Sequence, residues 1–138
     1  MKKTPLMITK RDLEMFKNHL LSGSNLSVFN KTQLSADLRD ARIVEEHELS
    51  DNVITTNSFV KLLDLDTNQE YRFYLVSPAG ANIKSNKVSV LAPIGMALFG
   101  YPAGASVKWE MPDGFKMYKI LSVSRSENTV PERQPVNN

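Results

Sequence analysis

Few side chains in this sequence have the types and spacing that catalysis or metal binding requires. The two histidines, His19 and His47, are far apart, and only His47 has acidic neighbours, in the run Glu45-Glu46-His47-Glu48. A metal site needs more ligands at suitable spacing, and a short glutamate run is typical of a solvated helix end. We therefore expect exposed or partly buried histidines and no metal site, with cation binding by the glutamates as the alternative.

Other catalytic signatures are absent from the sequence. The chain has no cysteine, which excludes disulfides, thiolate nucleophiles and cysteine-ligated zinc. It has no Gly-x-Ser-x-Gly run and no Gly-x-x-x-x-Gly-Lys-Ser/Thr run, so neither a nucleophile elbow nor a P-loop is predicted. We expect a protein that is not an enzyme and that needs no cofactor.

Apolar and aromatic residues offer two further candidates for binding. Aromatic residues on strands usually pack in the core or pair with a residue of the neighbouring strand. We expect this role for four aromatic residues, with the lining of a ligand groove as the alternative: Tyr71, Phe73, Tyr74 and Trp109. Leu26 and Val28 lie in a polar connector, where exposed apolar groups mark a contact with a partner. The alternative is that both residues pack onto the rest of the chain.

The first element that must position these residues is an N-terminal helix. Thr9 is a good N-cap, with Asp12 three residues later as in a capping box. Leu13, Phe16 and Leu20 then recur with helical spacing on one face. The polar run from residue 22 to residue 25 ends this helix.

A second helix follows with similar start signals. Asn30 is a candidate N-cap with Gln33 three residues later, and Leu34, Leu38 and Ala41 continue one face. Two short amphipathic helices with a polar connector predict an antiparallel helical hairpin over residues 1–50. The alternative is two separate helices that pack on the rest of the chain.

Beyond residue 51 the pattern changes from helical to alternating. Turn residues separate short alternating runs, and Pro93 can open a short helix that ends near Gly100. The predicted strands are 59–65, 71–76, 88–91, 106–111 and 115–123. The fold class is therefore α+β, with an antiparallel sheet over residues 51–124 curled around one short helix. Residues 125–138 are polar and predicted to be a disordered tail.

Composition limits the class of partner. Hydrophobic residues make up 41% and charged residues 23% of the chain, and the net charge is +2, as in an ordinary globular protein. No run approaches the roughly 20 apolar residues of a membrane span, and no signal peptide is evident. No basic stripe is visible in sequence order, although folding can still assemble one. We expect a cytoplasmic protein without membrane contact or sequence-specific nucleic-acid binding; its oligomeric state stays open.

The segment Lys87–Gly100, with the sequence KVSVLAPIGMALFG, resembles a stretch of the Gre transcript-cleavage factors. Ala103-Gly104, Pro112-Asp113-Gly114 and the strand Tyr118–Val123 follow in the order found in that family. The resemblance covers residues 53–124 and is nearest to the regulator of nucleoside diphosphate kinase (Rnk) group, whose N-terminal coiled coil is short. It implies an FKBP-like domain that docks on RNA polymerase at the rim of the secondary channel, with the helical hairpin pointing inward.

The resemblance also assigns a docking turn. Leu91, Ala92, Pro93 and Ile94 match that turn by position, and Leu91 stands where Gre factors often have an acidic residue. Together with the two connector residues, the predicted partner-binding residues are Leu91, Ala92, Pro93, Ile94, Leu26 and Val28.

In cleavage factors, carboxylates at the hairpin tip help to hold a catalytic magnesium ion in the polymerase. This sequence has no Asp or Glu between Glu14 and Asp37, and Lys17 and Lys31 flank the connector. Hard cations need oxygen ligands, preferably charged ones. We therefore expect a non-catalytic regulator that competes with Gre factors. The alternatives are a peptidyl-prolyl isomerase, implied by the FKBP-like fold, and an adaptor for another protein.

Overall fold

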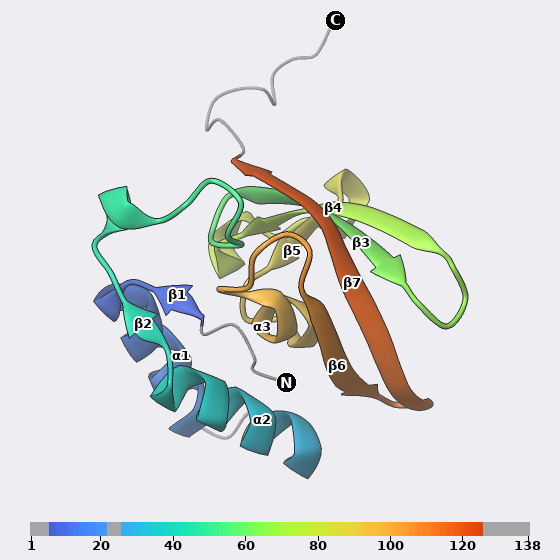
Figure 1. Ribbon diagram of the computed structural model, residues 1–138, viewed down its shortest axis with the longest axis horizontal. Helices are drawn as coiled ribbons and strands as arrows, with labels where there is room; N and C mark the ends of the chain where they lie inside the picture. Colours follow the sequence, from blue (N-terminus) through green and yellow to red (C-terminus); the bar gives the residue numbers. More distant parts are fainter. Residues whose placement is uncertain (1–5, 22–25, 126–138) are drawn as a thin grey trace, which may run out of the picture.

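The computed structural model describes residues 6–21 and 26–125 of the chain. Its main element is a five-stranded sheet with the strand order β5-β4-β3-β7-β6, curled around the short helix α3 (Pro93–Leu98) (Figure 1). The strands are β3 (Ser58–Asp64), β4 (Glu70–Val76), β5 (Lys87–Ser89), β6 (Ser106–Met111) and β7 (Gly114–Arg125). The predicted α+β class, with a curled sheet around one short helix, is confirmed.

One strand departs from the predicted antiparallel arrangement. β5 pairs with β4 in parallel, with Val88 opposite Leu75, whereas the other neighbouring pairs of this sheet are antiparallel. The chain between β4 and β5 forms two 3-10 turns, η2 (Pro78–Gly80) and η3 (Ile83–Ser85), and returns to run in the same direction as β4. This longer connection is needed because a tight hairpin cannot join two parallel strands.

The last strand is longer than the sequence pattern predicts. β7 continues past Val123 to Arg125, which pairs with Ser58 of β3. The Arg125 guanidinium donates hydrogen bonds at 2.9 Å to two backbone oxygens that precede β3. Arg125 therefore belongs to the sheet and not to the predicted tail. The rest of that predicted tail, residues 126–138, lies outside the described residues.

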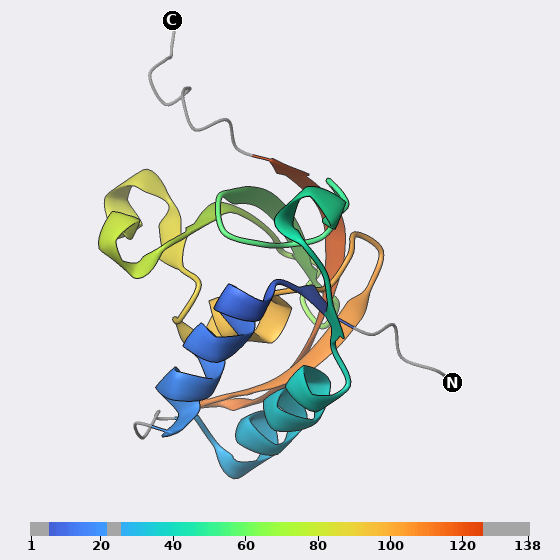
Figure 2. The ribbon, with the colours of Figure 1, turned by 90° about the vertical axis from the view of Figure 1, so that its left-hand side faces the viewer.

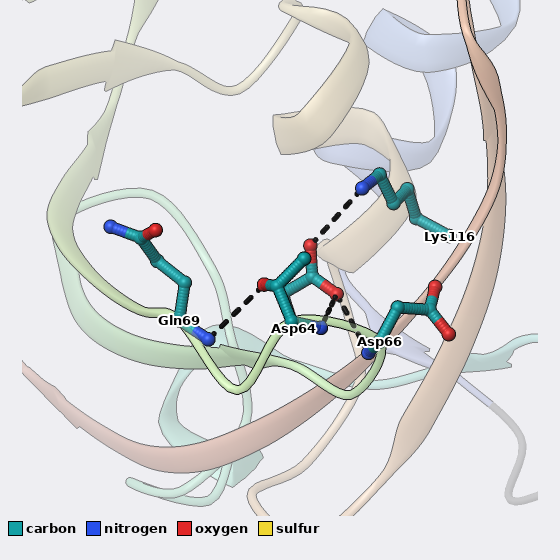
Figure 3. A network of polar contacts seen from close by, with 5 residues as sticks. Asp64, Asp66, Gln69 and Lys116 are labelled. Carbon is teal, nitrogen blue, oxygen red and sulfur yellow. Dashed lines mark hydrogen bonds and ion pairs between the residues drawn. The ribbon is translucent and has the colours of Figure 1, made fainter.

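The hairpin between β3 and β4 is closed by Asp64, which is 2% exposed. Its Oδ1 accepts hydrogen bonds from the backbone N–H groups of Asp66 and Thr67 at 2.8 and 3.2 Å, and its Oδ2 lies 3.4 Å from Nζ of Lys116 (Figure 3). Burial alone raises the pKa of this carboxyl, but the two N–H donors and the Lys116 ammonium outweigh it and lower the pKa. A buried carboxylate thus anchors the predicted turn.

Helix α1 (Lys10–Leu21) begins where the sequence predicts. The Thr9 hydroxyl accepts a hydrogen bond from the N–H of Asp12 at 3.2 Å. Phe16 is buried on the inner face, and its ring meets that of Phe99 edge to face, with centroids 4.8 Å apart. Because Phe99 directly follows α3, this contact fixes α1 against the centre of the sheet domain.

Helix α2 (Val28–Arg39) begins earlier than predicted. The assignment of Asn30 as its N-cap is wrong, because the cap is Ser27, whose hydroxyl accepts the N–H of Asn30 at 3.1 Å. Both residue types are good caps, so the local pattern does not separate them. The helix ends at Arg39, and Ala41 does not continue its apolar face as predicted.

The two helices run in roughly opposite directions, as predicted for a helical hairpin (Figure 2). Their outer ends are joined by a parallel pair of short strands that the pattern does not predict, β1 (Met7–Ile8) and β2 (Arg42–Ile43). The buried side chains of both helices belong to the same cluster as those of the sheet and α3. The predicted units 1–50 and 51–124 therefore share one hydrophobic core.

Candidate partner-binding site

The predicted docking turn joins β5 to α3 and is held by local hydrogen bonds. The Ser89 hydroxyl accepts the N–H of Leu91 at 3.0 Å, and the Ser89 backbone oxygen accepts the N–H of Ala92 at 3.0 Å. Ala92 is the N-cap of α3, and the exposed Pro93 occupies the first helical position, where its missing N–H removes no helical hydrogen bond. The turn is therefore a preformed surface feature.

Gly95 allows this turn to lie directly against β5. A Cβ atom at residue 95 would overlap the backbone oxygen of Ser89 and lie 3.0 Å from backbone atoms of Val90. No side chain fits in this space, so α3 folds back over the end of β5 only because residue 95 is glycine.

A depression of about 410 Å³ lies beside Pro93, where the start of α2 meets the end of β6. We call it the Trp109 pocket. Its lining residues are Leu26, Ser27, Asn30, Pro93, Trp109, Glu110, Met111 and Pro112. A mainly apolar lining with a few fixed polar groups is typical of a site that accepts a ligand or a side chain of a partner.

The four aromatic residues considered in the sequence have different environments. Trp109 is 1% exposed and Phe73 is also buried, which confirms the core assignment for both. Tyr74 forms a cross-strand ring contact with Phe59, with centroids 4.8 Å apart, while Tyr71 is exposed. The buried indole N–H of Trp109 has no acceptor among the described residues. Trp109 is thus both a core residue and a wall of the pocket.

Asn30 builds another wall of the pocket. Its side-chain Nδ2 donates to the backbone oxygen of Glu110 at 2.8 Å, and its Oδ1 accepts the backbone N–H of Glu110 at 2.8 Å. Nε2 of Gln33, one turn further along α2, donates to the backbone oxygen of Lys108 at 2.8 Å. Side chains of α2 therefore take the place of a neighbouring strand along the edge of β6.

The other half of α2 is held by Asp37. The hydroxyl of Tyr101 donates to Oδ2 of Asp37 at 2.6 Å, and burial together with this carboxylate raises the pKa of Tyr101. Asp37 therefore faces the sheet domain and not the solvent, and Arg42, beyond the end of the helix, lies on β2. Four hydrogen bonds made by three α2 residues thus fix this helix against the sheet domain.

The structure brings together two of the six predicted partner-binding residues. Leu26 and Pro93 both line the Trp109 pocket. Leu91 and Ile94 flank Pro93 in the turn but are partly buried against the core. Val28, on the first turn of α2, is 82% exposed and does not line the pocket.

The glutamate run is exposed, as predicted, but it is not the end of a helix, because α2 ends at Arg39 and β2 lies between. It forms the single 3-10 turn η1 (Glu46–Glu48), and the carboxylate of Glu48 accepts the backbone N–H of Glu45 at 2.8 Å. Within residues 6–21 and 26–125, no three His, Asp or Glu side chains are grouped so as to hold a metal ion. In the same part of the chain, no helix has the length and apolar character needed to cross a membrane.

Sequence reasoning missed the role of Asn30 and the contribution of Met111 and Pro112 to the pocket. One signal was available for Asn30. Ser27 is an equally good cap three residues earlier, and an asparagine inside a helix is unfavourable unless its side chain has a specific partner. No local signal marks Met111 or Pro112, because their place in the pocket depends on α2.

Comparisons with known proteins agree with this architecture. Residues 49–125 match the family described as "Transcription elongation factor, GreA/GreB, C-term". Transcription elongation factor GreA of Clostridium botulinum (strain Hall) is 36% identical over 94 residues, which are 68% of this chain and 59% of that protein. GreA of Thermodesulfovibrio yellowstonii is 33% identical over 92 residues, 67% of this chain and 58% of that protein. The chain thus spans about three fifths of the length of these relatives.

The solved structure of a prokaryotic transcription elongation factor GreA/GreB from Nitrosomonas europaea aligns with a TM-score of 0.65 and 30% identity. The alignment covers 88% of this chain and 99% of that chain, so it reaches beyond the sheet domain into the N-terminal helical region. The family match itself covers more than half of the chain. This chain therefore belongs to the GreA/GreB family of transcription elongation factors.

Proposed function

We propose that this protein binds RNA polymerase through the turn Leu91–Ile94 and the Trp109 pocket, and regulates transcription without stimulating transcript cleavage. In this role it occupies the rim of the secondary channel and competes there with cleavage-competent Gre factors. The proposed role needs no catalytic group, metal or cofactor from this chain. It places the protein in the cytoplasm, where the polymerase is.

The observation that carries the proposal is the attachment of α2 to the sheet domain. Hydrogen bonds from Asn30 and Gln33 to β6, and from Tyr101 to Asp37, hold this helix along the sheet edge. The helices α1 and α2 have 12 residues each, about 18 Å at 1.5 Å per residue. A helix pair this short, packed on the core, does not reach as far as a long projecting coiled coil. The short helical part also supports membership of the Rnk group.

Charge gives an independent argument against cleavage. Residues 15–36, which include the connector between the two helices, contain no Asp or Glu. Lys17 and Lys31 lie in this stretch. A magnesium ion needs oxygen ligands, and carboxylates supply most of the binding. The connector offers only neutral oxygen atoms and therefore has no carboxylate with which to hold a second metal ion in a polymerase active site.

Docking is tested by a binding assay with core polymerase and the variant Pro93→Asp. Aspartate is well tolerated in the first turn of a helix, so this change alters the docking surface without removing α3. We expect at least about tenfold weaker binding, as for loss of a buried apolar contact. Pro78→Asp is the matched control, because Pro78 also begins a short helix and is exposed. Full affinity of Pro93→Asp would overturn the docking surface.

The non-catalytic role is tested with stalled elongation complexes. The protein alone is expected to leave the nascent RNA intact, and in excess it is expected to slow the cleavage stimulated by an authentic Gre factor. The Pro93→Asp variant should lose this inhibition, whereas Pro78→Asp should keep it. Trimming of the RNA by the purified protein would overturn the proposal.

The Trp109 pocket also favours a second candidate, an adaptor for a different protein or a peptidyl-prolyl isomerase. A cross-linker placed at Leu26, on the pocket rim, distinguishes the adaptor, because it should capture polymerase if the first proposal is right. Catalytic turnover of a prolyl peptide would identify the isomerase. If the protein shows no turnover of the prolyl peptide and cross-links to polymerase, both the adaptor and the isomerase are excluded.

A further inference from the structure

The outer face of the sheet, turned away from α3, collects lysines that are far apart in the sequence. Along β3, Val60 and Leu62 are buried, so Lys61 and Leu63 point to the opposite face. Residues directly opposite each other on paired strands share a face. Leu63 pairs with Lys119 of β7, which is therefore also on the outer face.

The same rule extends this surface to β6. Met117 is two residues from Lys119 on β7 and pairs with Lys108 of β6. Lys61, Lys119 and Lys108 thus form a diagonal row across three strands, which we call the basic stripe. Diagonal neighbours on adjacent strands are about 7–8 Å apart, so the three charges act as one surface.

The lysines of the basic stripe are not held in ion pairs with described residues, although acidic residues share their face. None of its three lysines forms an ion pair with a described residue. Two acidic residues share the outer face of the four strands β4, β3, β7 and β6. Glu110 is two residues from Lys108 on β6, and Glu70 of β4 lies opposite Leu63 and forms an ion pair with Arg72 at 2.9 Å. The chain as a whole has nearly equal numbers of basic and acidic residues, 17 and 15. The positive charge of this face is therefore produced by folding.

Aromatic rings lie at one end of the basic stripe. Nζ of Lys108 is 4.9 Å from the ring centroid of Phe115 and 5.7 Å from that of Phe29. The two rings meet edge to face at 4.9 Å, and Phe115 is 49% exposed. An accessible ring held beside a row of cations is suited to stacking on a base whose phosphates contact the lysines.

We propose that the outer sheet face binds single-stranded nucleic acid without sequence preference, with phosphates along the basic stripe and a base on Phe115. An acidic protein surface would be attracted to the lysines equally but would gain nothing from the ring. The inference rests on the sheet register and the ring contacts, and it does not depend on the polymerase-docking proposal. It is compatible with the expected absence of sequence-specific binding.

The test uses fluorescence anisotropy with labelled oligouridylate and oligothymidylate of about 20 nucleotides, at about 50 mM and 200 mM salt. We expect the double variant Lys61→Glu, Lys119→Glu to bind at least about tenfold more weakly, with a salt slope smaller by about 1.4, or 0.7 for each lost phosphate contact. Lys10→Glu, Lys17→Glu on α1 changes the net charge equally and should stay within about twofold. The two oligonucleotides differ in the 2′-hydroxyl and in the C5-methyl group of the base, and similar affinities are expected for binding to phosphates and a base face.

The Phe115→Ala variant tests the stacking part. It should weaken single-strand binding by about fivefold or more, as for loss of one stacked base, and leave binding to a duplex of equal length unchanged. Four results would overturn the proposal: no binding at the lower salt concentration, equal losses in the stripe and α1 variants, no effect of Phe115→Ala, or equal competition by polyglutamate at the same charge concentration. Pro93→Asp should leave oligonucleotide binding intact, so this proposal and the docking proposal can fail separately.

Discussion

The two N-terminal helices have the same length but are attached to the sheet domain by different interactions. α1 is attached mainly by burial of Leu13 and Phe16 and by the ring contact with Phe99. α2 also buries apolar residues, but Asn30 and Asp37 add hydrogen bonds to specific partners. Apolar burial is strong and non-directional, whereas hydrogen bonds fix position. Stability should therefore depend most on α1, and the shape of the Trp109 pocket on α2.

The largest effect is expected from Phe16→Ala in α1. Removing this buried ring leaves a cavity beside Phe99 and should lower the free energy of unfolding by about 3–5 kcal/mol. Urea unfolding should be followed by far-UV circular dichroism, which reports the helices, and by fluorescence of Trp109, the single tryptophan. If the helices share the core, the two transitions coincide.

The control for Phe16→Ala is a substitution of its exposed neighbour, Lys17. Lys17→Ala should change the free energy of unfolding by at most about 0.5 kcal/mol. A shift of the dichroism transition in Phe16→Ala with an unchanged Trp109 transition would contradict the shared core. That result would show that the helices unfold as a separate unit.

A smaller effect is expected from Asn30→Ala in α2. The N–H and C=O of Glu110 both lose their partner, and the free energy of unfolding should fall by about 2 kcal/mol. Ser35→Ala, exposed on the same helix, is the control and should be nearly neutral. Because Asn30 lines the pocket, polymerase binding should also weaken in Asn30→Ala but not in Ser35→Ala. Equal stability of the two variants would mean that these hydrogen bonds do not hold α2.

Tyr101→Phe removes the hydrogen bond to Asp37 in the other half of α2. The expected loss is about 1 kcal/mol, measured by thermal or urea unfolding. Tyr74 lies on the outer sheet face, away from α2. Tyr74→Phe therefore removes a hydroxyl without affecting α2 and is the control for Tyr101→Phe. A loss in Tyr101→Phe as large as that in Phe16→Ala would show that polar contacts dominate the attachment of the helices.

The smallest effect concerns pH and Asp12 in the first turn of α1. Burial raises the pKa of this carboxyl, against the opposing effect of the Thr9 hydrogen bond. A raised folded-state pKa contributes stability that is present below the unfolded pKa and lost as pH rises through the folded value. Asp12→Asn removes this loss, so its stability relative to the wild type should increase as pH rises above about 4. A pH-independent difference in urea midpoints would refute this.

Much of the fold is predictable because its signals are local. Thr9 before an apolar period predicts the start of α1, and Pro112-Asp113-Gly114 predicts the turn between β6 and β7. Pro93 similarly marks the start of α3. Each signal acts within a few residues through fixed dihedral angles or a cap, so it needs no knowledge of the rest of the chain.

The candidate sites are less predictable because they depend on contacts between distant residues. Asn30 and Glu110 are 80 residues apart, and no local pattern shows that a helical asparagine will replace a strand along β6. The parallel direction of β5 and the register that aligns Lys61 with Lys119 are also set by the completed sheet. The turn containing Pro93 was predicted from family resemblance, but the pocket beside it was not.

The order of the strands delays completion of this fold during translation. β3 is the middle strand of the sheet, yet one of its two neighbours is β7, the last strand. Until residue 125 has left the ribosome, one edge of β3 has no pairing strand, and the apolar face carrying Val60 and Leu62 is incompletely covered. Unpaired apolar strand edges promote aggregation. A premature stop codon before β7 would therefore yield an insoluble fragment rather than a shortened, working protein.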